Sequence, residues 1–398
     1  MNKLSFMDML LDGSEVEWRP LSEEVKTVTA PAKLNRNTYR QEGKIPIIDQ
    51  GLEFIAGYTN EEVPAVTAGK YIIFGDHTEH IKYVDFSFIQ GADGLKILRP
   101  ISANAKYIYY ALENFYKKEL NYKRHWSSAQ ATLIPIPCPS NPKRSLEIQG
   151  EIVRILDTFT ELTAELTAEL TARKKQYNYY RDQLLRFDDG EVEWKTLEDV
   201  ASFRRGSFPQ PYGNNEWYDG EGSMPFVQVA DVADFGFTLN PKTNQRISKL
   251  AQPKSVFVEA GTVIVSLQGT IGRVAITPYD SYVDRTLAIF TGYKMAINKK
   301  YFAHQLKAKF DKEKEHARGS TLKTITKEEF AKFEIPIPAI ESQNRIVSLL
   351  DKFDTLTHSI TEGLPREIEL RQKQYEYYRD LLLSFPKPDG IAIAYDDE

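Results

Sequence analysis

The feature that most constrains the fold is an internal repeat, because four sequence blocks recur in the same order in the two halves of the chain. The pairs are EVEWRPLSEEV at 15–25 with EVEWKTLEDV at 191–200, IPIP at 134–137 with IPIP at 335–338, QGEIVRILDTF at 149–159 with QNRIVSLLDKF at 343–353, and KKQYNYYRDQLLRF at 174–187 with QKQYEYYRDLLLSF at 372–385. Such self-similarity indicates that one structural frame occurs twice. Two inserts without obvious mutual identity, at about 31–130 and 195–335, separate the blocks.

The frame segments are typical of long helices. Residues 149–187 are rich in good helix formers and contain no Pro, and about 30 helical residues would span ~45 Å. The run ELTAELTAELTA at 161–172 places Leu162, Leu166 and Leu170 on one face, and this stripe requires a partner helix. The second copy, 342–385, is the predicted partner in an antiparallel coiled coil, and Gly363-Leu364-Pro365 should break it. The pair is interpreted either as a purely structural coiled coil or as a spacer between the inserts.

The inserts show mixed strand and turn patterns. Residues 70–86 and 261–277 contain short β-branched and aromatic runs, and the second resembles two strands across a Gly-bounded turn. Helical stretches are expected at 106–120 and 299–316. We therefore predict an α+β fold of two globular domains joined by long helices. The predicted boundaries are 1–147 for the first domain, 148–188 for the central helix, 189–340 for the second domain, 341–386 for the C-terminal helix and 387–398 for a disordered tail.

Composition restricts the class of protein. A chain of 398 residues predicts two or three domains, and no apolar run approaches the ~18 residues of a membrane span, so a cytoplasmic location without membrane contact is expected. The formal net charge of −5 argues against a nonspecific nucleic-acid binder. By segment, however, the inserts carry +2 and +4 and the remainder −11, so the inserts are mildly basic and the frame is acidic.

Most catalytic patterns are missing from the sequence. Gly43-Lys44 and Gly69-Lys70 lack the earlier glycine of a phosphate-binding loop, and no G-x-S-x-G, NPPY, DPPF or G-x-G-x-x-G motif occurs. Cys138 is the only cysteine, which excludes an internal disulfide and Cys-rich zinc sites. His77 and His80 in DHTEH could share a metal with a neighbouring carboxylate, but without two further ligands a solvated loop or phosphate contact is favoured. No catalytic or metal site is predicted.

Residue types suited to DNA contact gather near the ends of both inserts. Arg reads guanine, Asn and Gln read adenine, and Ser or Lys hold phosphate, although an exposed loop of this composition is more often only solvated. The candidates in the first insert are Lys33, Asn35, Arg36, Asn37, Tyr39, Arg40, His77, His80, Lys82, Lys123, Arg124, His125, Trp126, Ser127, Ser128 and Gln130. Those in the second insert are Arg204, Arg205, Gly206, Ser207, Gln210, Tyr212, Gln268, Thr270, Arg273, Arg285, Arg318, Ser320, Thr321 and Lys323.

Taken together, the duplicated frame, the T-A-E-L run and the paired QYxYYRDxLLxF endings closely resemble the specificity subunit of type I restriction–modification systems. The resemblance covers nearly the whole chain. It implies a non-catalytic DNA reader in which each insert is a target-recognition domain for one half of an asymmetric bipartite site. It also implies partners: two methyltransferase subunits that use S-adenosylmethionine for adenine N6 methylation, and motor-nuclease subunits that use ATP and Mg²⁺. This chain itself is expected to hold no cofactor.

The resemblance also assigns motifs. The family's polar segment before IPIP is matched by Ser127, Ser128 and Gln130 in the first insert and by Gly319, Ser320 and Thr321 in the second. Its opening loop is matched by Arg205-Gly206, and its central strand pair is matched by GTIG at 269–272. The first insert lacks a clear R-G loop and a GTIG, so unrelated half-sites are expected. The alternatives are a specificity subunit serving a fused methyltransferase-nuclease, an enzyme with an unrecognised site, and a coiled-coil scaffold without a DNA role.

Overall fold

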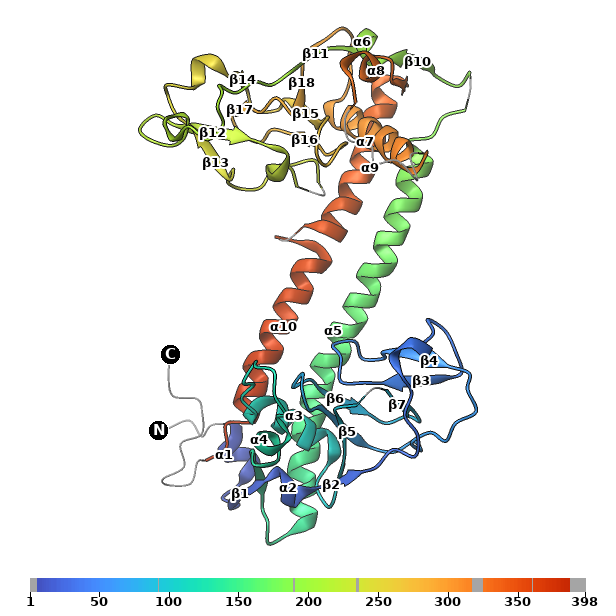
Figure 1. The fold of residues 1–398 in the computed structure, drawn as a ribbon, viewed down its shortest axis with the longest axis vertical. Helices are drawn as coiled ribbons and strands as arrows, with labels where there is room; N and C mark the ends of the chain where they lie inside the picture. The colour runs from blue at the N-terminus through green and yellow to red at the C-terminus, as the bar shows by residue number, and fades with distance from the viewer. Residues whose placement is uncertain are drawn as a thin grey trace. The chain divides into compact units, whose positions relative to one another are not determined.

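The chain divides into two compact units in a computed structural model that describes residues 6–91, 93–188, 190–233, 236–316, 325–359 and 361–386. Unit 1 comprises residues up to 165 and from 369 onward, and unit 2 comprises residues 166–368 (Figure 1). Each unit contains one insert and part of the frame, so the divisions fall within the frame helices. The predicted tail, 387–398, lies outside the described residues.

Unit 1 combines one small and two larger sheets with short helices. Its elements before the frame helix are α1 (Phe6–Leu11), β1 (Val16–Pro20), α2 (Leu21–Glu24), β2 (Val25–Val28), η1 (Arg36–Thr38), β3 (Ile45–Ile48), β4 (Gly57–Thr59), β5 (Tyr71–Gly75), β6 (Ile81–Val84), β7 (Ile89–Gln90), β8 (Leu95–Pro100), α3 (Ala105–Phe115), α4 (Trp126–Gln130) and β9 (Leu133–Pro137). The sheet orders are β1-β9, β2-β8-β5-β6 and β4-β3-β7. All five residues of β5 are buried, as its central place requires.

Unit 2 repeats this arrangement. Its elements are β10 (Glu193–Thr196), α6 (Leu197–Val200), β11 (Ala201–Arg205), η2 (Asn215–Trp217), β12 (Met224–Val227), η3 (Val229–Asp231), β13 (Gln245–Ile247), η4 (Gln252–Lys254), β14 (Val256–Val258), β15 (Val263–Ser266), β16 (Val274–Ile276), β17 (Ser281–Val283), β18 (Leu287–Tyr293), α7 (Lys299–His316), α8 (Lys327–Ala331) and β19 (Glu334–Ile337). The sheet orders are β10-β19, β11-β18-β15-β16 and β13-β12-β17-β14.

The two inserts therefore share a topology despite their dissimilar sequences. The order β2-β8-β5-β6 corresponds to β11-β18-β15-β16, and the parallel pair β3·β7 corresponds to β12·β17. The predicted strand pair at 261–277 is confirmed as β15 and β16, which are antiparallel. Both domains are α+β, as predicted from the sequence.

The frame helices are α5 (Pro142–Leu184), α9 (Ile340–His358) and α10 (Gly363–Leu382). The predicted break is confirmed, because α9 ends before Gly363. This glycine has φ +79°, and a Cβ there would lie 2.4 Å from Thr355 O at the end of α9. The central helix begins at Pro142, earlier than the predicted 148, because Pro is well tolerated in a first helical turn.

Within each unit the frame helices run antiparallel. In unit 1, residues 148–156 of α5 cluster with Leu382 and Leu383 at the end of α10, while Phe159 stacks on Tyr378, one turn earlier in α10. In unit 2, Tyr180 stacks on Phe353, and Leu185 clusters with Ile346 nearer the start of α9. The three repeat leucines Leu162, Leu166 and Leu170 are half-buried.

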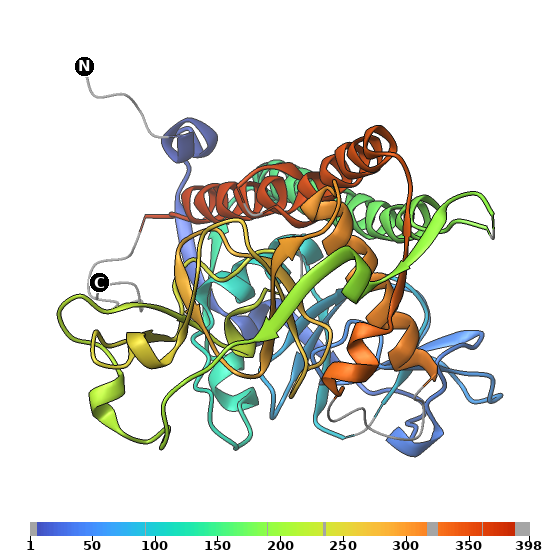
Figure 2. The ribbon, with the colours of Figure 1, turned by 90° about the horizontal axis from the view of Figure 1, so that it is seen from above.

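The largest core of unit 1 joins the recognition domain to the frame. Tyr107 of α3 is fully buried there, and its hydroxyl donates to Pro135 O at 2.6 Å. Helix α1 lies beside the end of α10 (Figures 1 and 2), where Met7 and Leu11 join the same core as Leu382. No helix in the described ranges is both long and apolar enough to cross a membrane.

Candidate nucleic-acid interface

In unit 1, a turn and a loop meet at one edge of the recognition domain. The turn, residues 76–80, connects the central strand β5 to β6, and the loop, residues 116–125, connects α3 to α4. His77 stacks on Tyr122 with ring centroids 5.5 Å apart and 18° between planes, and His77 Nδ1 lies 3.1 Å from Lys123 O. The predicted helix 106–120 ends at Phe115 because the N–H groups of Glu119 and Leu120 donate to the buried carboxylate of Glu79 rather than to helical carbonyls.

This junction brings two of the predicted DNA segments together. Lys33 Nζ lies 2.8 Å from Asp93 Oδ1, and the hydrogen bond and charge of Lys33, with a smaller contribution from Arg124, lower the pKa of Asp93. Lys33 and Arg124, 91 positions apart in the sequence, thus both lower the pKa of one carboxyl group. The neighbouring candidates Asn35, Arg36, Asn37, Arg40 and Ser127 are exposed, whereas Tyr39, His80, Ser128 and Gln130 are half-buried.

Two predicted DNA contacts of the first insert are wrong because their side chains are enclosed in the domain. Lys82 is 6% exposed, its ammonium donates to Asp49 O and Glu53 O, and burial lowers its pKa. His125 is fully buried, with Nε2 2.8 Å from Asn121 O. Trp126 is half-buried, with its ring 6.0 Å from that of Phe74.

In unit 2, several predicted contacts have scaffold roles. Gly206 is buried, and a Cβ there would lie 2.1 Å from Val283 O, so the R-G motif permits close packing of two backbones and is not an exposed DNA contact. Arg273 Nη1 donates to Val229 O and Val232 O, and Arg205 Nη2 donates to Ile325 O. These two guanidinium groups hold loops in place.

An aromatic and basic cluster in the second domain brings exposed cations onto partly or fully buried rings. The Arg285 guanidinium lies 5.1 Å from the ring centre of Tyr212, whose hydroxyl donates to Asp284 Oδ2 at 2.5 Å. Burial, with this hydrogen bond, raises the pKa of Tyr212. Lys254, absent from the sequence prediction, lies 4.7 Å from the ring centre of Trp217, and Ser207 Oγ donates to Lys254 O. These contacts hold two cations over aromatic rings.

The remaining predicted contacts of unit 2 are dispersed. Arg204, Gln210 and Thr270 are exposed and Gln268 is half-buried. The GTIG turn is fixed by Ser266 Oγ, which donates to Thr270 O at 2.5 Å, and by the close packing of Gly272 on Phe310. Arg318, Ser320, Thr321 and Lys323, with Gly319, lie outside the described residues.

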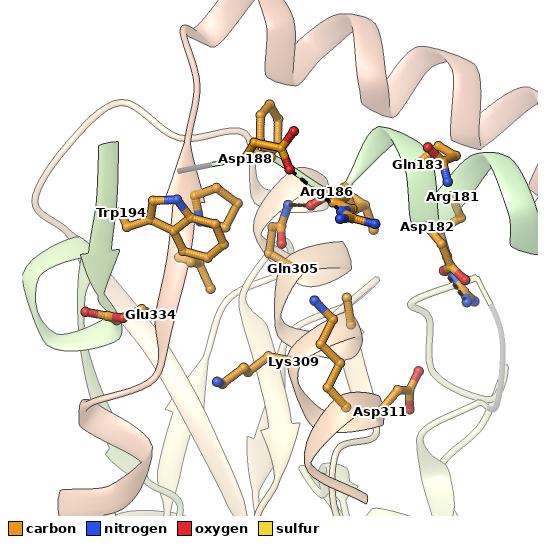
Figure 3. A pocket seen from close by; sticks show the side chains of 16 residues that line it. Arg181, Asp182, Gln183, Arg186, Asp188, Trp194, Gln305, Lys309, Asp311 and Glu334 are labelled. Atoms are coloured by element: carbon orange, nitrogen blue, oxygen red, sulfur yellow. Dashed lines mark hydrogen bonds and ion pairs between the residues drawn. The ribbon is translucent and has the colours of Figure 1, made fainter. Parts of the chain in front are cut away.

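A cavity of about 650 Å³ in unit 2 lies away from these clusters, between the end of α5, α7 and the β10/β19 pair (Figure 3). Trp194, Gln305 and Lys309 line it, and Gln305 Nε2 donates to Leu185 O. It contains none of the predicted DNA residues. Charges of both signs surround it, which favours neither a nucleic acid nor an acidic ligand. Among the described residues, no group of three or more His, Cys, Asp or Glu side chains could hold a metal ion.

The structure adds features that the sequence prediction missed. Tyr122, 91% exposed, was not among the candidates, although it directly precedes the segment 123–130 in which candidates were proposed. The two inserts also share a helix start: Asn104 N donates to Gln149 Oε1 at 2.8 Å and Asn298 N donates to Gln343 Oε1 at 2.9 Å. Aligning NAKY at 104–107 with NKKY at 298–301 would have revealed this correspondence.

Comparison with known proteins gives one consistent result. The family described as "Type I restriction modification DNA specificity domain" matches residues 15–173 and again 190–370. The chain is 42% identical to the type I restriction enzyme EcoR124I/EcoR124II specificity subunit of Escherichia coli, over 98% of this chain and 100% of that protein. It is 32% identical to a putative type I restriction enzyme specificity subunit of Haemophilus influenzae, over 96% and 99% of the two chains.

Solved structures show the same fold. A type I restriction–modification S subunit from M. genitalium matches with a TM-score of 0.57 at 15% identity, covering 94% of this chain and 98% of that chain. A chain from a structure of type I restriction–modification complex assembly matches with a TM-score of 0.60 at 16% identity, covering 92% and 97%. With two family matches that together span most of its length, the chain belongs to the type I restriction–modification DNA specificity family.

Proposed function

We propose that this chain reads an asymmetric bipartite DNA site, one half-site per recognition domain, and that it delegates the chemistry to partner subunits. The observation that carries the proposal is the duplicated domain: two inserts of one topology present different side chains at corresponding places. Two domains that share a topology but differ in their surface side chains are suited to reading two half-sites of different sequence. S-adenosylmethionine, ATP and Mg²⁺ would then be bound by methyltransferase and motor-nuclease partners in the cytoplasm.

Methylation mapping tests the proposal. The chain is co-expressed with its methyltransferase partner, and adenine methylation is mapped on a plasmid library in which two half-sites and the gap between them vary. We expect methylation of one bipartite sequence with a fixed gap, and none when the chain or the partner is omitted. Methylation by the chain alone would show that the chain is itself an enzyme. Methylation without sequence preference would contradict the proposal that the chain recognises a DNA sequence.

A partner that binds in two copies is supported by the repeated frame. Tyr179 and Tyr377 occupy matching positions in the two QYxYYRD blocks and are 62% and 65% exposed. Large exposed aromatics at duplicated places are suited to two equivalent contacts with partner proteins. We expect Tyr179→Ala and Tyr377→Ala each to weaken one of two methyltransferase contacts, so that mass photometry detects complexes with a single copy. Unchanged two-copy complexes in the double variant would place the contact elsewhere.

The T-A-E-L repeat supports a role as spacer. Removing four residues shortens a helix by ~6 Å and turns it by a net ~40°, close to the ~34–36° per base pair of DNA. Deleting residues 167–170 should therefore shorten the preferred gap by one base pair and leave both half-sites unchanged. The gap-length library measures this, and an unchanged gap would contradict the spacer role.

A further inference from the structure

The 116–125 loop of unit 1 presents large side chains to solvent in a fixed arrangement. Tyr122 is 91% exposed and Leu120 is 85% exposed, yet the ring of Tyr122 stacks on His77 of the neighbouring turn. The carbonyl of the next residue, Lys123, lies 3.1 Å from His77 Nδ1. The end of this loop is thus exposed without being loosely held, which is an arrangement suited to binding a partner.

Beneath the loop lies a buried carboxylate. Glu79 is 2% exposed and accepts hydrogen bonds from Tyr116 Oη at 2.6 Å, Glu119 N at 2.8 Å and Leu120 N at 2.9 Å. Burial by itself raises the pKa of Glu79, but these hydrogen bonds, assisted by His125, outweigh it and lower the pKa. The carboxylate is therefore ionised at neutral pH and holds the first half of the loop through charge-assisted hydrogen bonds.

A buried histidine holds the second half. His125 is fully buried and its Nε2 donates to Asn121 O at 2.8 Å, since a carbonyl oxygen can only accept. Its Nδ1 lies 3.4 Å from Glu79 Oε1. Asp76 accepts from His125 N through its carbonyl and from Trp126 N through Oδ1 at 2.9 Å. Both ends of the loop are thus tied to the turn that carries His77.

We propose that the 116–125 loop is the principal base-reading element of the first recognition domain, that Tyr122 and Arg124 contact the DNA, and that Glu79 and His125 are positioning residues for them. The inference rests on the proposed function and assigns it to residues. Arg124 is exposed, and on the same domain Lys33, paired with the exposed Asp93, supplies a second cation suited to phosphate. Arginine reads one base pair through two hydrogen bonds, and an aromatic ring adds apolar contact with the bases.

Holding this loop before binding has an energetic consequence. A loop that is ordered only on the DNA would lose side-chain and backbone entropy at that moment, whereas a loop held by Glu79 and His125 has already lost it. Substitutions of Glu79 or His125 that release the loop should therefore reduce discrimination among first half-site sequences, even though neither side chain is exposed to DNA. Discrimination at the second half-site, read by the other unit, should not change.

The first test uses exposed residues, for which folding is not at risk. Full-length variants are assembled with the methyltransferase partner and assayed on a library of first half-sites joined to one second half-site. Arg124→Ala should lower methylation of the preferred site roughly 10- to 100-fold and relax one base position. Tyr122→Ala should lower it about tenfold, whereas Tyr122→Phe should retain most of it. Lys70→Ala is the matched control, because Lys70 is exposed and precedes β5 at the opposite end from the turn.

The second test addresses positioning. His125→Ala and Glu79→Gln should each reduce the differences in methylation rate among first half-sites. The preference among second half-sites should keep its wild-type value, and this internal control shows that the chain is folded. His125→Gln can still donate to Asn121 O and should restore part of the discrimination lost in His125→Ala. A purely structural role would reduce methylation of all sites by one factor and leave the ranking of first half-sites intact, which would overturn the proposal for these two residues.

Failure of the proposed function and failure of the loop assignment give different results. If wild-type complexes methylate no bipartite site, the proposed function is wrong. If they do so and Tyr122→Ala and Arg124→Ala keep the wild-type ranking and rate, the function stands and the assignment of the loop is overturned.

Discussion

The two units are alike where the recognition domain joins the frame and differ where the turn and loop meet solvent. At the join, Tyr107 donates to Pro135 O and Tyr301 donates to Pro336 O, and both hydroxyls are buried. At the solvent edge, unit 1 uses the buried Glu79 and His125, whereas the corresponding turn of unit 2 packs Gly272 against Phe310. The join is therefore maintained by repeated chemistry, while the exposed edge is free to diverge.

A second difference lies at the cavity shown in Figure 3. In unit 1, Phe115 lies edge-on to Trp18 with centroids 5.1 Å apart, and Trp18 Nε1 donates to Pro386 O. In unit 2, Lys309 occupies the position of Phe115 by sequence correspondence, and Trp194 is 40% exposed beside the cavity. At this repeated position, unit 2 therefore has a lysine where unit 1 has a phenylalanine, and the cavity of unit 2 is open there.

The largest expected effect is a loss of stability that is confined to unit 2. Gly206→Ala would place a Cβ 2.1 Å from Val283 O and 2.4 Å from Asp284 O, atoms that cannot move without displacing backbone. We expect a loss of more than about 3 kcal/mol in the free energy of unfolding of unit 2, measured by urea denaturation. Gly213→Ala is the control, because no atom lies within 4 Å of its Cβ position, and it should be nearly neutral. Equal midpoints for the two variants would contradict the packing argument.

The next effect concerns pH. Burial lowers the pKa of His304 to about 4, with Asp354 opposing the shift and Arg181 and Lys300 adding to it. Because the unfolded chain takes up this proton near pH 6.5 and the folded chain does not, stability should fall as the pH drops from about 6.5 towards 4. The full loss is about 3 kcal/mol.

His304→Gln should remove this part of the pH dependence, which urea denaturation at several pH values would detect. In unit 1 the matching position is Tyr110, whose pKa is raised and which therefore stays neutral over this range. An unchanged pH slope in His304→Gln would show that other groups cause the acid sensitivity.

A smaller effect compares the two buried tyrosines. Tyr107→Phe and Tyr301→Phe each leave a buried prolyl carbonyl without its donor, and each should cost about 1–2 kcal/mol of unfolding free energy. Tyr301→Phe should cost more, because the Tyr301 hydroxyl also accepts from Gln305 Nε2 at 2.9 Å. Thermal unfolding of the two variants side by side measures the difference, and a larger loss in Tyr107→Phe would contradict it.

The smallest effect concerns a repeated ion pair. Lys106 pairs with Asp157 at 2.7 Å, and Lys300 pairs with Asp351 at 2.8 Å. The Lys300 pair is more exposed, so Lys300→Ala should change the unfolding free energy by less than about 0.5 kcal/mol. Lys106→Ala should cost about 1 kcal/mol, because Asp157 also accepts from Tyr110. Calorimetry of both variants checks the order, and equal losses would show that burial is not decisive here.

Much of the architecture was predictable. The four repeated blocks predicted two α+β domains on helices, and Gly363-Leu364-Pro365 predicted the break between α9 and α10. Helix propensity and a glycine close to the preceding carbonyls act locally, so these features can be inferred from adjacent residues. The shared topology of the inserts was not predicted, because many different apolar sequences can fill strands of the same order.

The site was predicted less well. Arg124 and Lys33 were proposed and are exposed, but His125 was proposed as a DNA contact and is buried, and Tyr122 was missed. Composition identifies residue types that are able to bind DNA, whereas burial depends on partners elsewhere in the chain. The carboxylate beside His125 belongs to Glu79, 46 positions earlier.

The order of amino acids alone therefore specifies the duplicated frame, the helices and the family, because periodicity, repetition and helix-breaking residues act over short distances along the chain. Which polar groups are exposed and which are enclosed was decided by the folded arrangement. The sheet brings the turn at 76–80 against the 116–125 loop, and there the buried Glu79 carboxylate gains enough hydrogen bonds to offset its desolvation. In unit 2 the corresponding turn instead packs Gly272 against Phe310, so the chemistry of each edge follows from its packing.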